Sequence, residues 1–95
     1  MTPTAFEFTV TIPSDVRLLE AIRLLAVQAA GYAKLTADAS AALAAAAARE
    51  TEAAMKSSRN GQAPIECLFA GDSNAVTITI SSQGRTRHVR QPVSA

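Results

Sequence analysis

The sequence predicts an α+β fold, a two-layer sandwich in which two helices cover one face of an antiparallel sheet of three to four strands. Three features predict it. Apolar and polar residues alternate near the start, apolar residues recur at helical spacing through the middle, and β-branched runs separated by turn residues follow. The predicted order is β-α-α-β-β-(β), in a single domain over residues 1–95 with flexible ends at residues 1–5 and 91–95.

The first predicted strand covers residues 6–12. Its apolar side chains share one side, at Phe6, Phe8, Val10 and Ile12, while Glu7, Thr9 and Thr11 share the other. This two-residue period is typical of a strand with one buried face. Pro13 ends the strand, because proline has no N–H to donate to a neighbouring strand.

Two helices are predicted next, near residues 15–33 and 37–57. Ser14 or Asp15 caps the first helix, and Gly31 offers a left-handed position at its end. The first helix buries one broad apolar side, made of Leu18, Leu19, Ile22, Leu25, Ala26, Ala29 and Ala33.

Alanine dominates the second predicted helix, which contains no glycine or proline. Thr36 caps its start, and Asp38 lies in the first turn, where a negative charge interacts favourably with the helix dipole. The small alanine side chains permit close packing against a neighbouring helix or sheet.

Strands are predicted at residues 65–69 and 76–81, with a short fourth strand within residues 86–89 at the edge of the sheet. Gly71-Asp72-Ser73-Asn74 and Gln83-Gly84 form the intervening turns. Arginines on the last strand would discourage aggregation through an open edge.

Most catalytic and metal-binding chemistries are excluded by composition. One cysteine and one histidine cannot supply the ligands of a zinc site, and neither a phosphate-binding loop nor a dinucleotide-binding glycine motif is present. Cys67 shares a two-residue period with Ile65 and Phe69, which predicts a buried structural thiol. The alternative is a nucleophile assisted by His88. We expect a non-enzyme that needs no metal or cofactor.

We expect a cytoplasmic protein without a membrane partner. Residues 1–8 lack the basic segment and apolar core of a signal peptide. The longest apolar stretch, residues 41–48, is far shorter than the roughly 20 residues that a membrane span needs. A lone cysteine also fits a reducing compartment.

A family resemblance begins at residues 8–15, which read Phe-Thr-Val-Thr-Ile-Pro-Ser-Asp. A helix carrying Arg23, then Gly31, then a second helix and a hairpin follow. This order resembles the bacterial anti-sigma-factor serine kinases of the histidine-kinase-like ATPase superfamily, whose first strand ends in a similar Ile-Pro-Ser segment. The resemblance covers roughly residues 6–84 and implies a scaffold that binds regulators of transcription.

The family's second helix carries a Glu-Ala-x-x-Asn box, in which the glutamate polarises water and the asparagine holds magnesium. Glu50 and Glu52 are the counterparts of that glutamate here. Four residues after them stand Ala54 and Lys56, and neither side chain replaces asparagine as a magnesium ligand.

The family's Asp-x-Gly box, in which the aspartate reads adenine, corresponds here to the segment from Ser82 to Gly84, with serine in place of aspartate. The chain ends about eleven residues later, so the family's ATP lid has no counterpart. The resemblance therefore implies a degenerate, shortened relative with no nucleotide site.

Three functions remain open. The first is a non-catalytic regulatory domain that binds a sigma factor, an antagonist or itself as a homodimer, through a sheet edge at residues 77–80 and 85–89. The second is an ATP-binding kinase-like anti-sigma factor with a non-standard site. The third is a small nucleic-acid-binding domain that uses a basic C-terminal segment, made of Arg85, Arg87, His88 and Arg90.

Overall fold

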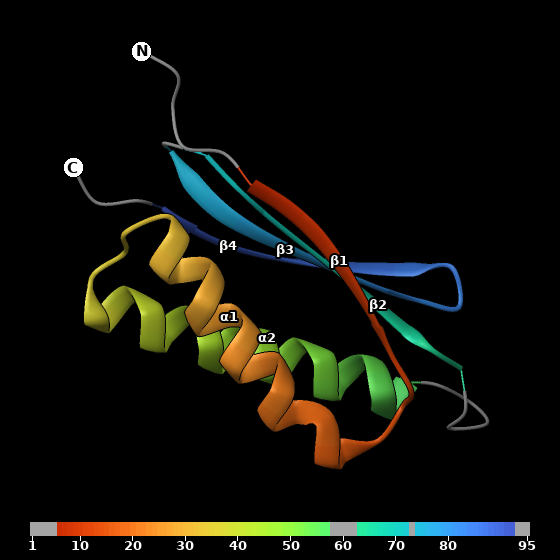
Figure 1. Ribbon diagram of the computed structural model, residues 1–95. Helices are drawn as coiled ribbons and strands as arrows, with labels where there is room; N and C mark the ends of the chain where they lie inside the picture. Colours follow the sequence, from red (N-terminus) through yellow and green to blue (C-terminus); the bar gives the residue numbers. More distant parts are fainter. Residues whose placement is uncertain (1–5, 58–62, 73, 93–95) are drawn as a thin grey trace.

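A computed structural model describes residues 6–57, 63–72 and 74–92 (Figure 1). Both helices lie on one face of a four-stranded antiparallel sheet, which confirms the predicted α+β sandwich. The elements in chain order are β1 (Phe6–Ile12), the 3₁₀ turn η1 (Val16–Leu18), α1 (Leu19–Tyr32), α2 (Ala37–Ser57), β2 (Ile65–Gly71), β3 (Ala75–Ser82) and β4 (Arg85–Pro92).

The strands are ordered β1-β2-β3-β4 in the sheet, and every neighbouring pair is antiparallel. The two helices connect β1 to β2, so the chain leaves the sheet and returns beside the strand it left. The edge strands are therefore β1 and β4. The expectation that residues 77–80 form an open edge is wrong, because β3 pairs with β2 on one side and with β4 on the other.

Strand β4 is longer than predicted and pairs with β3 along its whole length, from Arg85 opposite Ser82 to Pro92 opposite Ala75. It includes residues 91 and 92, which we expected in a flexible end, while residues 1–5 and 93–95 lie outside the described residues. The turn before it places Gln83 at φ 52° and Gly84 at φ 79°. Two positive φ values in a two-residue turn match the twist of a hairpin and favour glycine.

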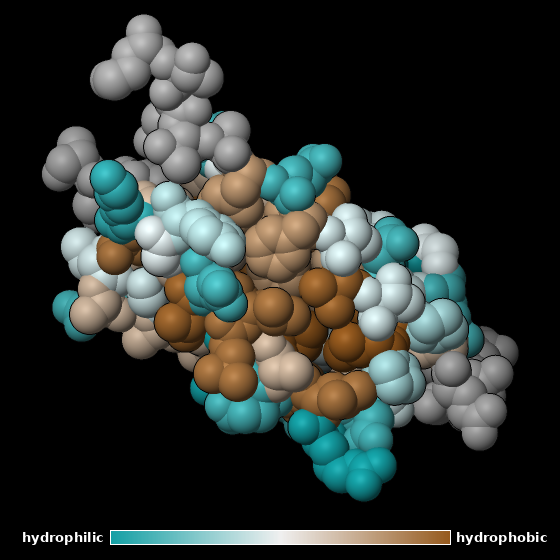
Figure 2. Space-filling view, in the orientation of Figure 1, coloured by the Kyte–Doolittle hydropathy of each residue, from teal (hydrophilic) through white to brown (hydrophobic). Residues whose placement is uncertain are grey.

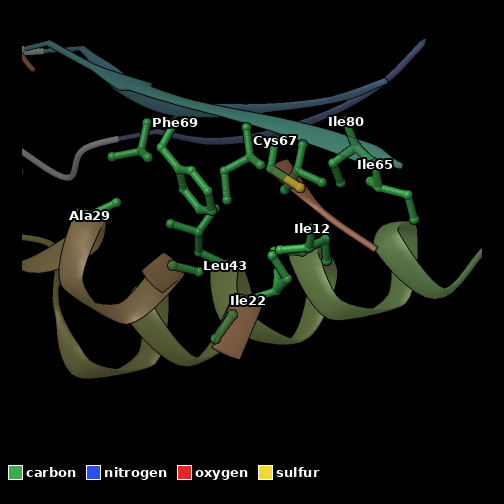
Figure 3. Close-up of a cluster of buried hydrophobic side chains, with 14 of the residues drawn as sticks. Ile12, Ile22, Ala29, Leu43, Ile65, Cys67, Phe69 and Ile80 are labelled. Atoms are coloured by element: carbon green, nitrogen blue, oxygen red, sulfur yellow. The ribbon is translucent and has the colours of Figure 1, made fainter. Parts of the chain in front are cut away.

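The core fills the space between the sheet and the helices (Figure 3). Its largest fully buried apolar side chains are Phe69, Ile22, Leu43, Ile65, Ile78, Ile80 and Val76. Helix α2 contributes mostly alanine to this layer, and its buried Thr51 donates a hydrogen bond from Oγ1 to the carbonyl of Ala47 at 2.7 Å. Small side chains let α2 lie close to α1 and to the sheet, as the sequence predicted.

The predicted caps are met at η1 and α2 but not at α1, which begins at Leu19, later than predicted, and has no side-chain cap. Asp15 caps η1, and its carboxylate accepts hydrogen bonds from the guanidinium and the backbone N–H of Arg17, which lower the pKa of Asp15 to about 2. Thr36 accepts a hydrogen bond from the backbone N–H of Ala39 at 3.1 Å. In the described part of the chain, neither helix is long and apolar enough to cross a membrane.

The end of α1 differs from the expectation. Gly31 lies inside the helix, and the left-handed residue is Lys34, with φ 59°. Leu35 donates to the carbonyl of Ala30 at 3.0 Å and Lys34 donates to the carbonyl of Gly31 at 3.1 Å, the two bonds of a Schellman cap. With this cap, the partly buried Leu35 packs against the core.

Candidate partner-binding surface

Glu50, which the sequence analysis matched to the family's glutamate, forms an ion pair with an arginine. Its Oε1 accepts a hydrogen bond from Arg87 Nη1 at 3.1 Å, and the two side chains are only 28% and 41% exposed. The pair joins α2 to β4, across the interface between the helix layer and the sheet. A carboxylate held by arginine is neutralised and is not free to polarise water.

The other residues that we matched to the family's boxes are Glu52, Lys56, Ser82 and Gly84. Glu52 pairs with Lys56 one turn along the same helix, with 3.9 Å between Oε2 and Nζ, and both side chains are largely in solvent. Ser82 Oγ is buried and finds no hydrogen-bond partner among the described residues. Gly84 occupies the hairpin turn, where backbone conformation explains its presence.

The described residues contain no group of His, Cys, Asp and Glu side chains able to hold a metal ion. The predicted buried thiol is confirmed, since Cys67 is fully buried in the core (Figure 3), where burial raises its pKa to about 11. His88 lies on the opposite face of the sheet, with Nδ1 3.3 Å from Thr79 Oγ1. The alternative of a nucleophile assisted by His88 is therefore wrong.

The basic C-terminal segment is divided between the two faces of the sheet. Arg85 and Arg87 lie opposite Ser82 and Ile80, on the face that carries the helices. His88 and the exposed Arg90 lie on the other face. The four side chains therefore do not form the single basic patch that a nucleic-acid backbone would need.

A large apolar surface lies on the side of the molecule that carries α1 and the edge strand β1. We call it the β1–α1 surface and define it by Phe6, Phe8, Leu24, Leu25 and Tyr32. Leu24 is 63% exposed and Tyr32 is 50% exposed. Figure 2 shows this band of apolar surface running over α1 and along β1, framed by polar residues.

The centre of the β1–α1 surface is a groove between the strand and the helix. It has a volume of about 330 Å³ and is lined by Phe8, Leu25, Gln28 and Tyr32. The hydrogen-bonding groups in this lining are the amide of Gln28 and the hydroxyl of Tyr32. The groove therefore offers an apolar recess with two hydrogen-bonding side chains, the composition of many binding sites in proteins.

Aromatic contacts hold the groove's wall in place. The ring centroid of Phe6 lies 5.5 Å from that of Tyr32 and 6.1 Å from that of Phe8. The rings of Phe8 and Phe69 stack with their centroids 4.9 Å apart. Phe6 also covers Gly71, its partner on β2, so closely that a Cβ atom on this glycine would overlap the ring. The absence of a side chain at position 71 is thus what lets Phe6 reach Tyr32.

Sequence patterns placed only part of this surface. The alternation in residues 6–12 placed Phe6 and Phe8 on the covered face, but it did not show that β1 is an edge strand whose side chains are partly exposed. Leu24 and Tyr32 fall outside the predicted buried side of α1. The sequence did indicate these two residues, because each is a large apolar side chain that lies outside the predicted buried side of the helix.

No known protein family matches the sequence, and a comparison with curated proteins finds no significantly similar chain. The function is therefore argued from the geometry of this chain.

Proposed function

We propose that this chain is a non-catalytic regulatory protein-binding domain. It uses a scaffold that resembles the anti-sigma-factor kinases and works without a nucleotide, in the cytoplasm. The partner is a sigma factor, an antagonist of such a regulator, or a second copy of the chain. The observation that carries this proposal is the β1–α1 surface with its apolar groove. Leu24 is more than half exposed on this surface, and Tyr32 is half exposed.

A soluble domain gains nothing from leaving large apolar side chains together in water. Fully burying one leucine contributes roughly 1.5–3 kcal/mol, so covering Leu24 with a partner is a substantial source of affinity. Contiguous apolar patches rimmed by polar residues commonly mark protein-interaction sites. Figure 2 shows polar residues on both sides of the apolar band.

The ion pair between Glu50 and Arg87 supports the absence of a nucleotide. A nucleotide-bound magnesium ion is normally held by carboxylate or amide oxygens. Here the carboxylate of Glu50 already has a guanidinium partner, Lys56 adds a positive charge one and a half turns further along α2, and no acid stands at Ser82.

Thermal denaturation with Mg-ATP tests the nucleotide half of this proposal. A ligand that binds only the folded chain must raise the melting temperature by mass action. We expect no change at millimolar Mg-ATP. A rise that an equal concentration of sulfate does not reproduce would show an ATP site and contradict the proposal.

A paired substitution tests the protein-binding half. Leu24→Glu places a charge in the β1–α1 surface, and Ala45→Glu places the same charge on an exposed position of α2 as a control. Self-association and binding to purified sigma factors and antagonists of the native host are measured for both. We expect Leu24→Glu to weaken at least one of these associations about tenfold or more, a loss of about 1.4 kcal/mol, and Ala45→Glu to weaken none. If Leu24→Glu leaves all of them unchanged, the surface is not a binding site.

A further inference from the structure

The two edges of the sheet differ in how well they resist pairing with another strand. Edge strand β4 carries three arginines and ends in proline, which oppose strand addition. Edge strand β1 carries one charged residue, Glu7, and contains no lysine, arginine or proline. Within the described residues β1 pairs only with β2. The backbone groups on its other side are thus open to hydrogen bonding with a further strand.

The sequence of β1 is complementary to itself when two copies run antiparallel about Thr9. Glu7 of one copy then lies opposite Thr11 of the other, so the two carboxylates are kept apart. On the face toward the helices, Phe8 lies opposite Val10 and Phe6 lies opposite Ile12. Pairs of an aromatic and a β-branched residue are among the favourable cross-strand pairs.

The helices are compatible with this pairing. A two-fold axis perpendicular to the sheet keeps the helices of both copies on the same face. Because β1 and α1 line one groove, the α1 helices of the two copies flank the axis. Leu24 and Tyr32 are exposed on α1. The dimer sets the second copy beside α1 and β1, where Figure 2 shows the apolar band. An isolated extended peptide would satisfy the strand edge and leave much of α1 uncovered.

We propose that the partner of the β1–α1 surface is a second copy of this chain, paired β1 to β1 about Thr9 so that the two four-stranded sheets become one continuous sheet. This inference rests on the proposed function, since it names the partner of the same surface. It uses the edge that the charge distribution leaves open and the self-complementarity of residues 6–12.

Light scattering coupled to size exclusion, from about 1 to 200 µM, measures the dimer directly. We expect a mass near twice 9.9 kDa at the upper concentrations. Thr9→Lys puts two lysines opposite each other on the axis, on the exposed face of the strand, and should raise the dissociation constant about tenfold or more. The matched control is Thr86→Lys, an exposed threonine on the other edge strand, which should leave the constant unchanged.

A second substitution tests the register. Thr11→Lys brings the new lysine opposite Glu7 of the other copy, once on each side of the axis. Two opposite-charge pairs should lower the dissociation constant about threefold or more in low salt. Both Thr9→Lys and Thr11→Lys place a lysine on the exposed face of β1, yet the first should raise the dissociation constant of the dimer and the second should lower it. Circular dichroism and thermal melts confirm that each variant is folded.

Three results would overturn the dimer: a wild-type monomer of 9.9 kDa at the highest concentration, a dimer that Thr9→Lys does not weaken, or a dimer that Thr11→Lys weakens. These results are separable from failure of the proposed function. A monomer whose binding to a sigma factor is weakened by Leu24→Glu would overturn the dimer alone. A β1-paired dimer that both Thr9→Lys and Leu24→Glu weaken, in a chain that Mg-ATP stabilises, would overturn the nucleotide-free half of the proposed function alone.

Discussion

The contact between Gly71 and Phe6 makes the wall of the β1–α1 surface sensitive to one methyl group. In Gly71→Ala the new Cβ atom overlaps the Phe6 ring, so the ring must move away from β2. Phe6 then loses its packing on Tyr32 and Phe8, and such aromatic pairs each contribute about 0.5–1.5 kcal/mol. The lost packing of about 1–3 kcal/mol exceeds the gain of about 0.4–1 kcal/mol from a stiffer unfolded chain.

We therefore expect Gly71→Ala to lower the free energy of unfolding by about 1–2 kcal/mol, measured by urea denaturation. The decisive comparison uses the Phe6→Ala background, which removes the ring that the methyl group displaces. There Gly71→Ala should be neutral or slightly stabilising, and the difference between the two backgrounds is the interaction energy. An equal cost in both backgrounds, or a gain in the wild-type background, would refute the role given to the ring.

Three other predictions concern the end of α1, the thiol and the ion pair. Gly31→Ala should raise the free energy of unfolding by about 0.5–1 kcal/mol, because Gly31 is helical and has open space around its Cα. Lys34→Gly should raise it by about 1 kcal/mol, because glycine adopts the left-handed conformation of this position without strain. Urea denaturation measures both changes. The thiol of Cys67 should resist iodoacetamide at about pH 8 until the chain unfolds. Because folding raises the pKa of this thiol from 9.0 to about 11, the free energy of unfolding should fall as the pH rises from 9 to 11, and the fall should be smaller in Cys67→Ala. A double-mutant cycle with Glu50→Gln and Arg87→Met should give a coupling of about 1 kcal/mol that shrinks in molar salt; a coupling of zero would show that the pair does not hold α2 to β4.

Local sequence patterns predicted each helix and strand, but they gave the bounds of β1 and α2 more accurately than those of α1 and β4. The alternation in residues 6–12 and the helix-favouring composition of residues 37–57 matched β1 and α2 to the residue. Both signals depend only on near neighbours, through the two-residue period of a strand and the high helix propensity of alanine. The cap of α2 at Thr36 was predictable for the same reason, whereas Asp15 caps the 3₁₀ turn before α1 rather than α1 itself.

Predictions that depend on tertiary contacts were less accurate. Residues 77–80 were expected at an edge, yet β3 is central, because β4 is a full-length strand. The arginines give the sequence of β4 a lower strand propensity than that of β3. Hydrogen bonds to β3 along the whole length of β4 stabilise the strand, and local propensity does not include them. Gly31 was expected to provide the left-handed residue at the end of α1, but that residue is Lys34, and the partly buried Leu35 after it packs against the core.

The sequence by itself determined that the chain is an α+β sandwich and that Cys67 is a buried core residue. Only the tertiary structure decided that Glu50 meets Arg87, that Cys67 and His88 lie on opposite faces of the sheet, and that β1 is an edge strand. The physical reason is separation along the chain. Periodicity and propensity act between near neighbours, whereas pairs such as Glu50 and Arg87 are brought together by packing of the whole core.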